Sequence, residues 1–523
     1  MSSRLRSLAI PDLALIGGGL TFFFVILLFD GGRKLFRDSD TGWHIRNGEA
    51  ILRSGALPWT DPYSWSMPGG EWFAWEWAAD VLMGLAHRQD GLTGVAFLYT
   101  ALIAVCTRLW FRLQWTVGGD FLLACLMASP MLSTVNLHWL ARPHVFGWVM
   151  LLVSIMWLDK LPAGAAWRGA LVAFGLASLW ANLHASFFLF PVMAMLYASA
   201  HLLRPLLWPV EAPPEHARAF SYIAVSGGAF LGTFLTPFGW RLHWHLASYL
   251  TNAELLARIG EFQTFNFHSP GAAQILVTLL LGGAGAILAL SQRKLAHFFL
   301  LAGFTILAIR SARALPVLAL LLPLSAGAIT RALHDAVPNF NRTPGRWLQN
   351  ALRYSANLRK LELGFSGLAW APIMAILGLA ILHFPALAAR TGFPPDEFPV
   401  AAATQAVAAL PPNARILAPD KFGGYLIYHF DGTRKVFFDG RSDYYGVQFM
   451  RDYIELVQVR PGMARHLSRF GFTHALLPRD YSLLSVLPPL GWREIYRDGT
   501  AVLLTAPASS SLGGTKQNEA GLK

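Results

Sequence analysis

Two carboxylic acids and an imidazole lie close together where the chain leaves its first apolar segment. Residues 37–51 read RDSDTGWHIRNGEAI and include Asp38, Asp40, His44 and Arg46. A carboxylate in such a position could accept a proton from a hydroxyl group, so Asp38 and Asp40 are the candidate catalytic residues. Taken singly, either aspartate could instead cap a helix or be a solvated charge at the membrane interface.

Further polar side chains occur at the same ends of later apolar segments. Ionisable groups at membrane depth are costly unless they face a partner or a water-filled cavity, so each is a weak indication of function. Because several segments point to one side, we expect a polar cavity that opens at the outer leaflet. Besides His44 and Arg46, the candidate binding residues there are Glu76, Arg142, His144, Asn182, His184, Arg241, Glu261, His268, Arg310 and Arg313.

This set of charges fits an anionic lipid carrier with a polar head. The arginines could hold phosphate oxygens by fork-shaped hydrogen bonding, while an aspartate takes a proton from an acceptor hydroxyl. A carboxylate would also stabilise the oxocarbenium-like transition state of glycosyl transfer. The acids and histidines could instead bind a divalent cation, Mg²⁺ or Mn²⁺, although no tight ligand spacing requires one. Structural histidines and arginines that reach lipid head groups are the alternatives for single residues.

The composition indicates that a membrane positions these residues. Hydrophobic residues make up 54% of the 523 residues and charged residues 14%, and the mean hydropathy is +0.43. The first apolar stretch, about 19 residues long, follows Arg4 and Arg6 and is predicted to be an uncleaved signal anchor with a cytoplasmic N-terminus. Together with ten further windows it predicts an α-helical polytopic membrane protein with about 11 transmembrane helices. These windows lie near residues 92–111, 119–136, 143–158, 167–183, 186–203, 219–237, 271–291, 295–310, 314–330 and 364–384.

The loop charges support this topology, because Lys and Arg concentrate in the loops predicted to be cytoplasmic. The same bias explains the net charge of +12 without nucleic acid. Only the first outer loop, residues 30–91, carries many positive charges on the outer side. Within it, WHIRNGEAILRSG predicts a helix with a Gly stop, PWTDPYSWSMPGG is typical of turns, and EWFAWEWAADVLMGLAHR predicts an interfacial amphipathic helix.

Residues 1–384 are thus predicted to form the membrane domain, residues 385–506 a small periplasmic α/β domain, and residues 507–523 a disordered tail. In the α/β domain, ARILAP, KVFFDGR and THALLP predict strands, and WREIYRDGTAVLLTA predicts a hairpin. Asp439, Arg441 and Asp443 follow one predicted strand, a common position for ligand contacts. The alternative interpretation is a turn held by a local Asp–Arg pair.

The sequence resembles bacterial multi-pass proteins of the GT-C glycosyltransferase superfamily, in a branch related to dolichyl-phosphate-mannose mannosyltransferases and lipid-linked-sugar transferases. The resemblance is carried by DSDTGWHIRNGEAILRSGALPWTDPYSWS, WFAWEWAADVL, ARPHVFGW, LWANLHASF, TPFGWRLHWHLASYL, GEFQTFNFHSP, FGGYLIYHF and KVFFDGRSDYYG. It implies a catalytic aspartate in the first outer loop, here Asp38 or Asp40. It also implies a polyprenyl-phosphate sugar donor and a periplasmic glycan, lipid or protein acceptor.

We therefore expect a glycosyltransferase of the bacterial inner membrane that transfers a hexosyl or pentosyl group. A transporter or lipid-handling protein with the same cavity and a catalytically silent scaffold are the alternatives. No Walker lysine, phosphate-binding Gly motif or G-x-S-x-G elbow occurs, which disfavours nucleotide-dependent and serine-hydrolase chemistry.

Overall fold

The computed structural model describes residues 3–339 and 343–507. The chain divides into two compact units. Unit 1 consists of Met1–Trp59 and Phe73–Gly392, and unit 2 consists of Thr60–Trp72 and Phe393–Lys523. A short segment of the first loop thus belongs to the same unit as the C-terminal part of the chain, which no pattern in the sequence indicated. We call this segment, Thr60–Trp72, the loop piece. Most of the predicted disordered tail, residues 508–523, lies outside the described residues.

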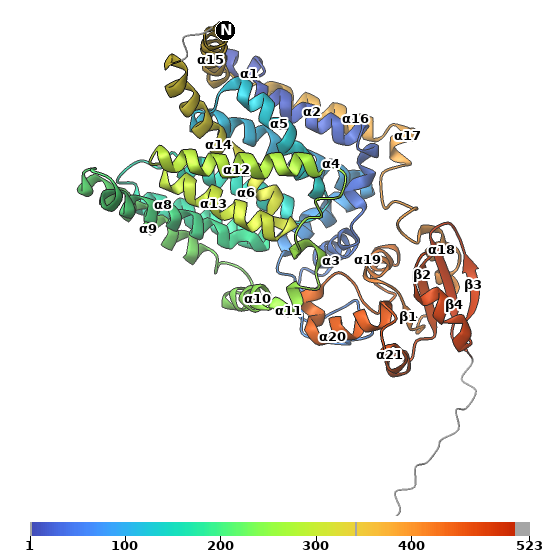
Figure 1. Ribbon diagram of the computed structural model, residues 1–523. Coiled ribbons are helices and arrows are strands. Elements are labelled where there is room, and N and C mark those ends of the chain that lie inside the picture. The colour runs from blue at the N-terminus through green and yellow to red at the C-terminus, as the bar shows by residue number, and fades with distance from the viewer. Residues whose placement is uncertain (1–2, 340–342, 508–523) are drawn as a thin grey trace, which may run out of the picture. The chain divides into compact units, whose positions relative to one another are not determined.

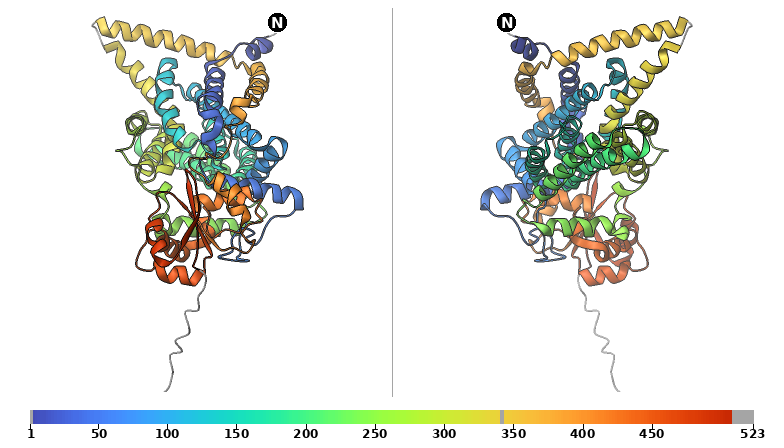
Figure 2. Two further views of the ribbon diagram at one scale, coloured as in Figure 1. Left: turned by 90° about the vertical axis from the view of Figure 1, so that its right-hand side faces the viewer. Right: turned by 90° about the vertical axis from the view of Figure 1, so that its left-hand side faces the viewer.

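Unit 1 is built of helices, because a backbone in lipid must satisfy its own hydrogen bonds. Its helices are α1 (Ser3–Ala9), α2 (Leu13–Leu27), α3 (Asp40–Ser54), α4 (Trp77–Val117), α5 (Phe121–Val135), α6 (His144–Leu158), α7 (Ala166–Leu183), α8 (Leu189–Leu207), α9 (Ala212–Gly232), α10 (Trp240–Thr251), α11 (Ala253–Leu256), α12 (Ala272–Ser291), α13 (Leu295–Arg310), α14 (Leu315–Ala336), α15 (Thr343–Gly364), α16 (Ala371–Leu382) and α17 (Pro385–Ala388). Helix α7 packs against α9. Helix α8 also packs against α9, and α12 packs against both α13 and α14 (Figure 1 and Figure 2).

The fold class predicted from the sequence is confirmed, and every predicted apolar window falls on a helix. Among the described residues, 6 helices are by themselves long and apolar enough to cross a membrane. The bent pair Gly345–Gly364 and Leu368–Leu382, with an angle of 58°, would be a seventh span if it crosses as one. Helices α6 and α13 are apolar but shorter. The total of about 11 spans therefore stays a prediction.

The first loop contains the two helices that the sequence predicted. Helix α3 ends at Gly55, whose φ of 66° is the left-handed conformation that glycine adopts without strain. The predicted interfacial helix is the first part of α4, which continues into the next apolar window. A break in the helical backbone at Asp90 and Gly91 separates the two parts. The interfacial segment and the window after it are thus one broken helix.

Helices α3 and α4 cross where two glycines allow their backbones to touch. A Cβ atom added to Gly48 would lie 1.7 Å from the backbone oxygen of Asp80, and one added to Gly84 would lie 2.5 Å from the backbone nitrogen of Glu49. This crossing holds the helix that begins at Asp40 against α4. Both glycines are therefore required for the close approach.

Replacing Gly48 by Ala is expected to lower the free energy of unfolding by about 1–3 kcal/mol, because backbone atoms cannot turn aside as a side chain can. The midpoint of thermal unfolding of the purified protein measures this change. Gly175→Ala in α7 is the matched control, since no atom lies within 4 Å of its added Cβ. Equal midpoints for the two variants would contradict the close crossing.

Unit 2 contains a four-stranded sheet in the order β1-β2-β4-β3. Strand β1 (Ile416–Leu417) pairs in parallel with β2 (His474–Pro478), and β4 (Ala501–Thr505) pairs antiparallel with both β2 and β3 (Arg493–Arg497). The small α/β character and the β3–β4 hairpin agree with the sequence. The helices of this unit are α18 (Val400–Gln405), α19 (Asp420–His429), α20 (Ser442–Val457), α21 (Met463–Phe470) and α22 (Leu483–Val486).

The segment KVFFDGR was predicted to be a strand, but it does not join the sheet. Its backbone pairs instead with the loop piece, through hydrogen bonds from Val436 N to Tyr63 O (2.9 Å) and from Trp65 N to Val436 O (3.0 Å). Only the isolated parallel bridge between Ser64 and Val436 results. The β-branched and aromatic residues that suggested a strand are buried because they pack inside unit 2.

A buried arginine holds the loop piece within unit 2. Arg441 lies 2.8 Å from the Asp61 carboxylate and 2.7 Å from the Asp439 carboxylate. Burial would raise the pKa of Asp61, but the positive charge of Arg441 and the hydrogen bonds that Ser64 and Tyr63 donate to this carboxylate together lower it. The guanidinium carbon also lies 4.8 Å from the ring centre of Trp72 and 5.2 Å from that of Tyr63. The local Asp–Arg turn that the sequence suggested exists, with a second carboxylate that the sequence did not indicate.

Candidate active site

Arg142 lies at the centre of three carboxylates in unit 1. Its Nη1 atom is 2.9 Å from Asp38 Oδ2 and 3.1 Å from Glu261 Oε1, and its Nη2 atom is 2.7 Å from Asp40 Oδ2. All four residues were candidates in the sequence, and the structure brings them together. We call Asp38, Asp40, Arg142 and Glu261 the Arg142 cluster.

Local hydrogen bonds fix the two aspartates beside Arg142. The Asp38 carboxylate accepts a hydrogen bond from the Asp40 backbone N–H (2.9 Å), which holds the turn into α3. The hydroxyl of Thr41 donates to the carbonyl of Ala141 (3.0 Å), and the Ala141 N–H donates to the carbonyl of Leu35 (2.9 Å). The first turn of α3 and the segment before it are therefore tied to the segment before α6.

The third acid comes from the connection between α11 and α12. Glu261 lies in a short 3-10 helix (Gly260–Phe262), and its backbone carbonyl accepts a hydrogen bond from the Ser311 hydroxyl (3.1 Å). Arg313 Nη1 is 3.6 Å from Glu261 Oε2, and its guanidinium lies 5.2 Å from the ring centre of Phe262. Arg313 thus extends the Arg142 cluster on the side of α13 and α14.

The charges around Glu261 predict how the stability of the protein depends on pH. Burial would raise the pKa of Glu261, but the positive charges of Arg142 and Arg313 outweigh it and lower the pKa to about 2. Because this is below the ordinary value of 4.5, the ionised carboxylate stabilises the fold fully above that value and progressively less as the pH falls towards 2.

The midpoint of thermal unfolding should therefore fall more steeply between about pH 5 and pH 3 in the wild-type protein than in Glu261→Gln. Parallel curves for the two proteins would show that ionised Glu261 contributes nothing to stability.

A second polar group lies deeper, between α3 and α4. The His44 Nδ1 atom is 2.5 Å from Asp80 Oδ1, and the Asn47 amide donates to Asp80 Oδ2 (2.6 Å). His44 is 1% exposed and Asp80 is fully buried, so neither side chain is accessible to a ligand. Their contact instead holds α3 in place against α4. The sequence analysis missed Asp80 and Asn47. The signal was present, since Asp80 follows Glu76 by four residues on one helical face.

Glu76 and three other candidates form a third group. Glu76 Oε1 is 3.5 Å from His184 Nε2, and the indole N–H of Trp77 donates to the Asn182 side chain (2.7 Å). The ring centres of His144 and His184 are 6.5 Å apart, and His144 Nε2 is 2.8 Å from the His138 carbonyl. These side chains connect the start of α4 to the start of α6 and the end of α7.

Four candidates lie outside these groups. Arg46 pairs with Glu49 (2.6 Å), and Arg241 is exposed and lies 6.0 Å from the ring centre of Trp59. His268 and Arg310 are exposed, and Arg310 has no ion-pair partner among the described residues. Of the candidate arginines, Arg142 and Arg313 are therefore the ones held beside the acids.

The arrangement of the acids does not fit a metal ion. Each carboxylate of the Arg142 cluster has an oxygen on the guanidinium group, and the part of the chain that the structure describes holds no set of three His, Cys, Asp or Glu that could bind a metal. A divalent cation, Mg²⁺ or Mn²⁺, which the sequence offered as an alternative, stays untested.

Sequence searches match no protein-family model and no curated protein. Solved structures do match. The archaeal oligosaccharyltransferase AglB from Archaeoglobus fulgidus, in complex with an inhibitory peptide and a dolichol-phosphate, has a TM-score of 0.53 and 11% identity over 89% of this chain and 69% of AglB. The apo form of an oligosaccharyltransferase from Archaeoglobus fulgidus has a TM-score of 0.52, with the same identity and coverage. ArnT from Cupriavidus metallidurans bound to undecaprenyl phosphate has a TM-score of 0.42 and 12% identity over 95% of this chain and 98% of ArnT, too low to carry an argument.

The chain has the GT-C fold. The TM-score of 0.53 demonstrates the shared fold, and an identity of 11% does not extend this to a shared substrate. In this GT-C fold the two aspartates follow α2 and a 3-10 helix (Asp30–Phe36), and the second of them begins α3. The resemblance seen in the sequence is therefore confirmed at the level of the fold, and the chain is a multi-pass membrane protein.

Proposed function

We propose that this protein is a membrane glycosyltransferase that moves a sugar from a polyprenyl-phosphate donor to an acceptor hydroxyl. The observation that carries the proposal is the gathering of Asp38 and Asp40 on Arg142, in a chain with the GT-C fold. The structure of AglB, which has the same fold, is of a complex with an inhibitory peptide and a dolichol-phosphate. A lipid-phosphate donor for the present protein is consistent with that complex.

The reaction requires one proton acceptor and one stabilised leaving group. Asp38 or Asp40 takes the proton of the acceptor hydroxyl as its oxygen bonds to the anomeric carbon of the sugar. The bond from that carbon to the phosphate oxygen breaks, and the polyprenyl phosphate leaves with the electron pair. The remaining carboxylates stabilise the positive charge that develops on the sugar ring.

The arginines divide between two roles. Arg142 is held by three carboxylates, so we assign it as the positioning residue of the acids and not as a phosphate ligand. Among the described residues, Arg313 has a single ion pair, a long contact of 3.6 Å with Glu261. Arg310 lies three residues before it at the end of α13. These two guanidinium groups are the proposed phosphate ligands of the donor.

We place the protein in the bacterial inner membrane, with a cytoplasmic N-terminus and a periplasmic C-terminal domain. The acceptor would then be a periplasmic glycan, lipid or protein, and the transferred sugar a hexose or pentose. This orientation follows from the distribution of Lys and Arg among the loops.

The test is a mass-spectrometric comparison of envelope glycans, lipids and glycoproteins between a deletion strain and its parent. We expect one species to lose the mass of a single sugar and to regain it when the wild-type gene is restored. An unchanged inventory in the deletion strain would count against glycosyl transfer and in favour of a silent scaffold.

A further inference from the structure

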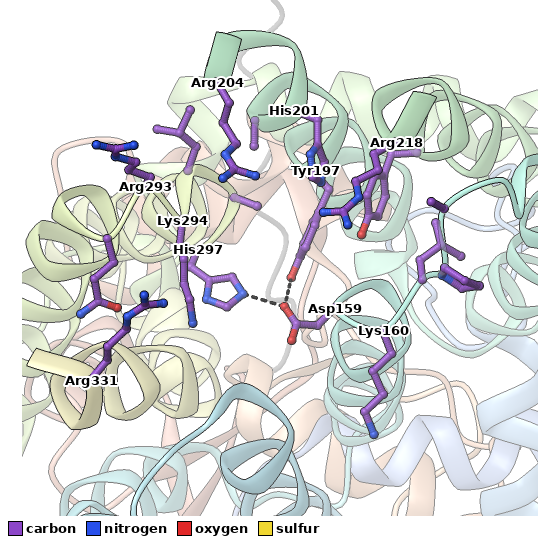
Figure 3. Close-up of a pocket in the computed structure, with 18 residues that line it drawn as sticks. Asp159, Lys160, Tyr197, His201, Arg204, Arg218, Arg293, Lys294, His297 and Arg331 are labelled. Atoms are coloured by element: carbon purple, nitrogen blue, oxygen red, sulfur yellow. Dashed lines mark hydrogen bonds and ion pairs between the residues drawn. The ribbon is translucent and has the colours of Figure 1, made fainter. Parts of the chain in front are cut away.

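A basic pocket lies in unit 1 at the end of the helices opposite to the Arg142 cluster. Helix α6 begins two residues after Arg142 and ends at Leu158, beside the pocket, which puts the two places about 22 Å apart along the helix. The cavity measures about 520 Å³. The charged side chains that line it, labelled in Figure 3, include Asp159, Lys160, Arg204, Arg218, Arg293, Lys294 and Arg331.

Six of these lining residues are Lys or Arg, and Asp159 is the one carboxylate among the lining residues. That carboxylate is already engaged, since His297 Nε2 lies 2.7 Å from it and the Tyr197 hydroxyl donates to it at 3.4 Å (Figure 3). Arg204 pairs with Glu215, at 2.9 Å, outside the lining. The remaining lysines and arginines of the lining therefore have no available carboxylate within the pocket.

Five of the six cations have no ion-pair partner within residues 3–339 and 343–507; they are Lys160, Arg218, Arg293, Lys294 and Arg331. Arg218 lies in the second turn of α9, Lys294 just before α13 and Arg331 in the last turns of α14. Burial lowers the pKa of Lys294 and the charge of Arg331 lowers it further, while Asp159 opposes the shift. Like charges that converge on a half-enclosed space repel one another, so an anion in the cavity would be stabilised.

The ordinary explanation of such charges is the preference of Lys and Arg for cytoplasmic loops. That preference accounts for their side of the membrane but not for their convergence from four helix ends on one cavity. A volume of about 520 Å³ is in the range of small-molecule sites and well above that of a single ion. Several donors around one space match the many acceptor oxygens of a phosphate group.

We propose that the basic pocket binds a phosphate-bearing ligand, at a place separate from the proposed transfer site. Large apolar side chains are exposed within one turn of Arg204, with Leu206 at 79% and Leu207 at 55%. Such surface would suit the acyl chains of a membrane lipid whose phosphate group enters the cavity. Soluble phosphate has the same head chemistry, so the two sources must be separated by experiment.

The experiment uses the full-length protein in a neutral detergent, analysed by native mass spectrometry. The probes are short-chain phosphatidic acid, which carries a phosphomonoester, inorganic pyrophosphate, and phosphatidylcholine as the zwitterionic control. The wild-type protein should retain phosphatidic acid in preference to phosphatidylcholine. The double variant Arg218→Gln with Lys294→Gln should retain it about tenfold less or weaker still, because two charge-assisted contacts are lost.

Two further variants separate binding from folding and from general charge. Arg168→Gln removes an exposed cation of α7 that lies over Trp167 and does not line the pocket, so it should retain the lipid as the wild type does. Lys294→Arg keeps the charge and should also retain it. If the double variant fails to fold, the single variants Lys294→Met and Arg331→Gln, checked for an unchanged unfolding midpoint, take its place.

Each outcome decides between the alternatives. Loss of phosphatidic acid alone assigns the pocket to a lipid head group, and parallel loss of pyrophosphate assigns it to phosphate in general. Equal retention by the wild-type protein and by the pocket variants would overturn the proposal, as would an equal loss in Arg168→Gln. The pocket would then be ordinary interfacial charge.

Discussion

Arg142→Gln is expected to abolish sugar transfer and to lower the stability of unit 1. In the wild-type protein one guanidinium group holds Asp38, Asp40 and Glu261 at distances between 2.7 and 3.1 Å. Without it, three carboxylates converge on one small region with no central cation. Removing one partner from such a largely buried arrangement typically costs about 3–5 kcal/mol.

The loss of activity should exceed what the loss of stability explains. The aspartates would separate or take up protons, and misplaced or protonated acids cannot act as the base. Transfer measured at a temperature where the variant remains folded should fall by about 100-fold or more. Arg142→Lys should recover only part of the activity, because a single ammonium group cannot serve several carboxylates with the fork geometry of arginine.

Arg241→Gln is the matched control for this experiment. Arg241 was also predicted to bind phosphate, but it is exposed and lies over Trp59. Its variant should remain within a few-fold of wild-type transfer. Wild-type activity in Arg142→Gln would show that the carboxylates do not need the guanidinium group for catalysis.

Arg441→Met should have the largest effect on unit 2. Arg441 is 2% exposed, and its partners Asp61 and Asp439 belong to segments far apart in the sequence. The substitution leaves two buried carboxylates without their cation, at a cost of about 3–5 kcal/mol. It also removes the cation–π contacts with Tyr63, Trp72 and Tyr444. We expect the loop piece to lose its protection from solvent.

Hydrogen exchange of the full-length protein measures this effect directly. Peptides covering residues 60–72 and 436–445 should exchange faster in Arg441→Met, while peptides from α12 and α14 should be unchanged. Arg497→Met is the control in the same unit, because Arg497 and its partner Glu494 are exposed and such pairs contribute little. Unchanged exchange in Arg441→Met would mean that backbone pairing alone holds the segment.

Much of the fold could be predicted because lipid imposes strong constraints on sequence. Long apolar runs without charges become helices, and each predicted window is helical in the structure. The Gly stop after α3 and the β3–β4 hairpin also followed from local residue preferences. The strand predicted at KVFFDGR failed because its backbone pairs with a loop piece more than 350 residues earlier in the chain. No local pattern carries such information.

The candidate site was predictable to a similar extent. Asp38, Asp40, Arg142, Glu261 and Arg313 were selected for their charge at the ends of apolar segments, and the structure brings these five together. The pairing of Arg46 with Glu49 is local, three residues apart on α3, and its spacing could have predicted it. Which charges meet across helices depends on helix packing, so the exposure of Arg310 could not be foreseen. The Arg441–Asp61 contact was missed for the same reason. The catalytic roles themselves stay predictions.

Consumption of a polyprenyl-phosphate sugar by the purified protein tests the central claim most directly. The comparison is between the wild-type protein, Asp38→Asn, Asp40→Asn and the double variant, each with a verified unfolding midpoint. We predict that at least one single variant loses about 100-fold or more of the transfer rate, because an amide cannot take the acceptor proton. Transfer at the wild-type rate by the double variant would contradict the assignment of these aspartates.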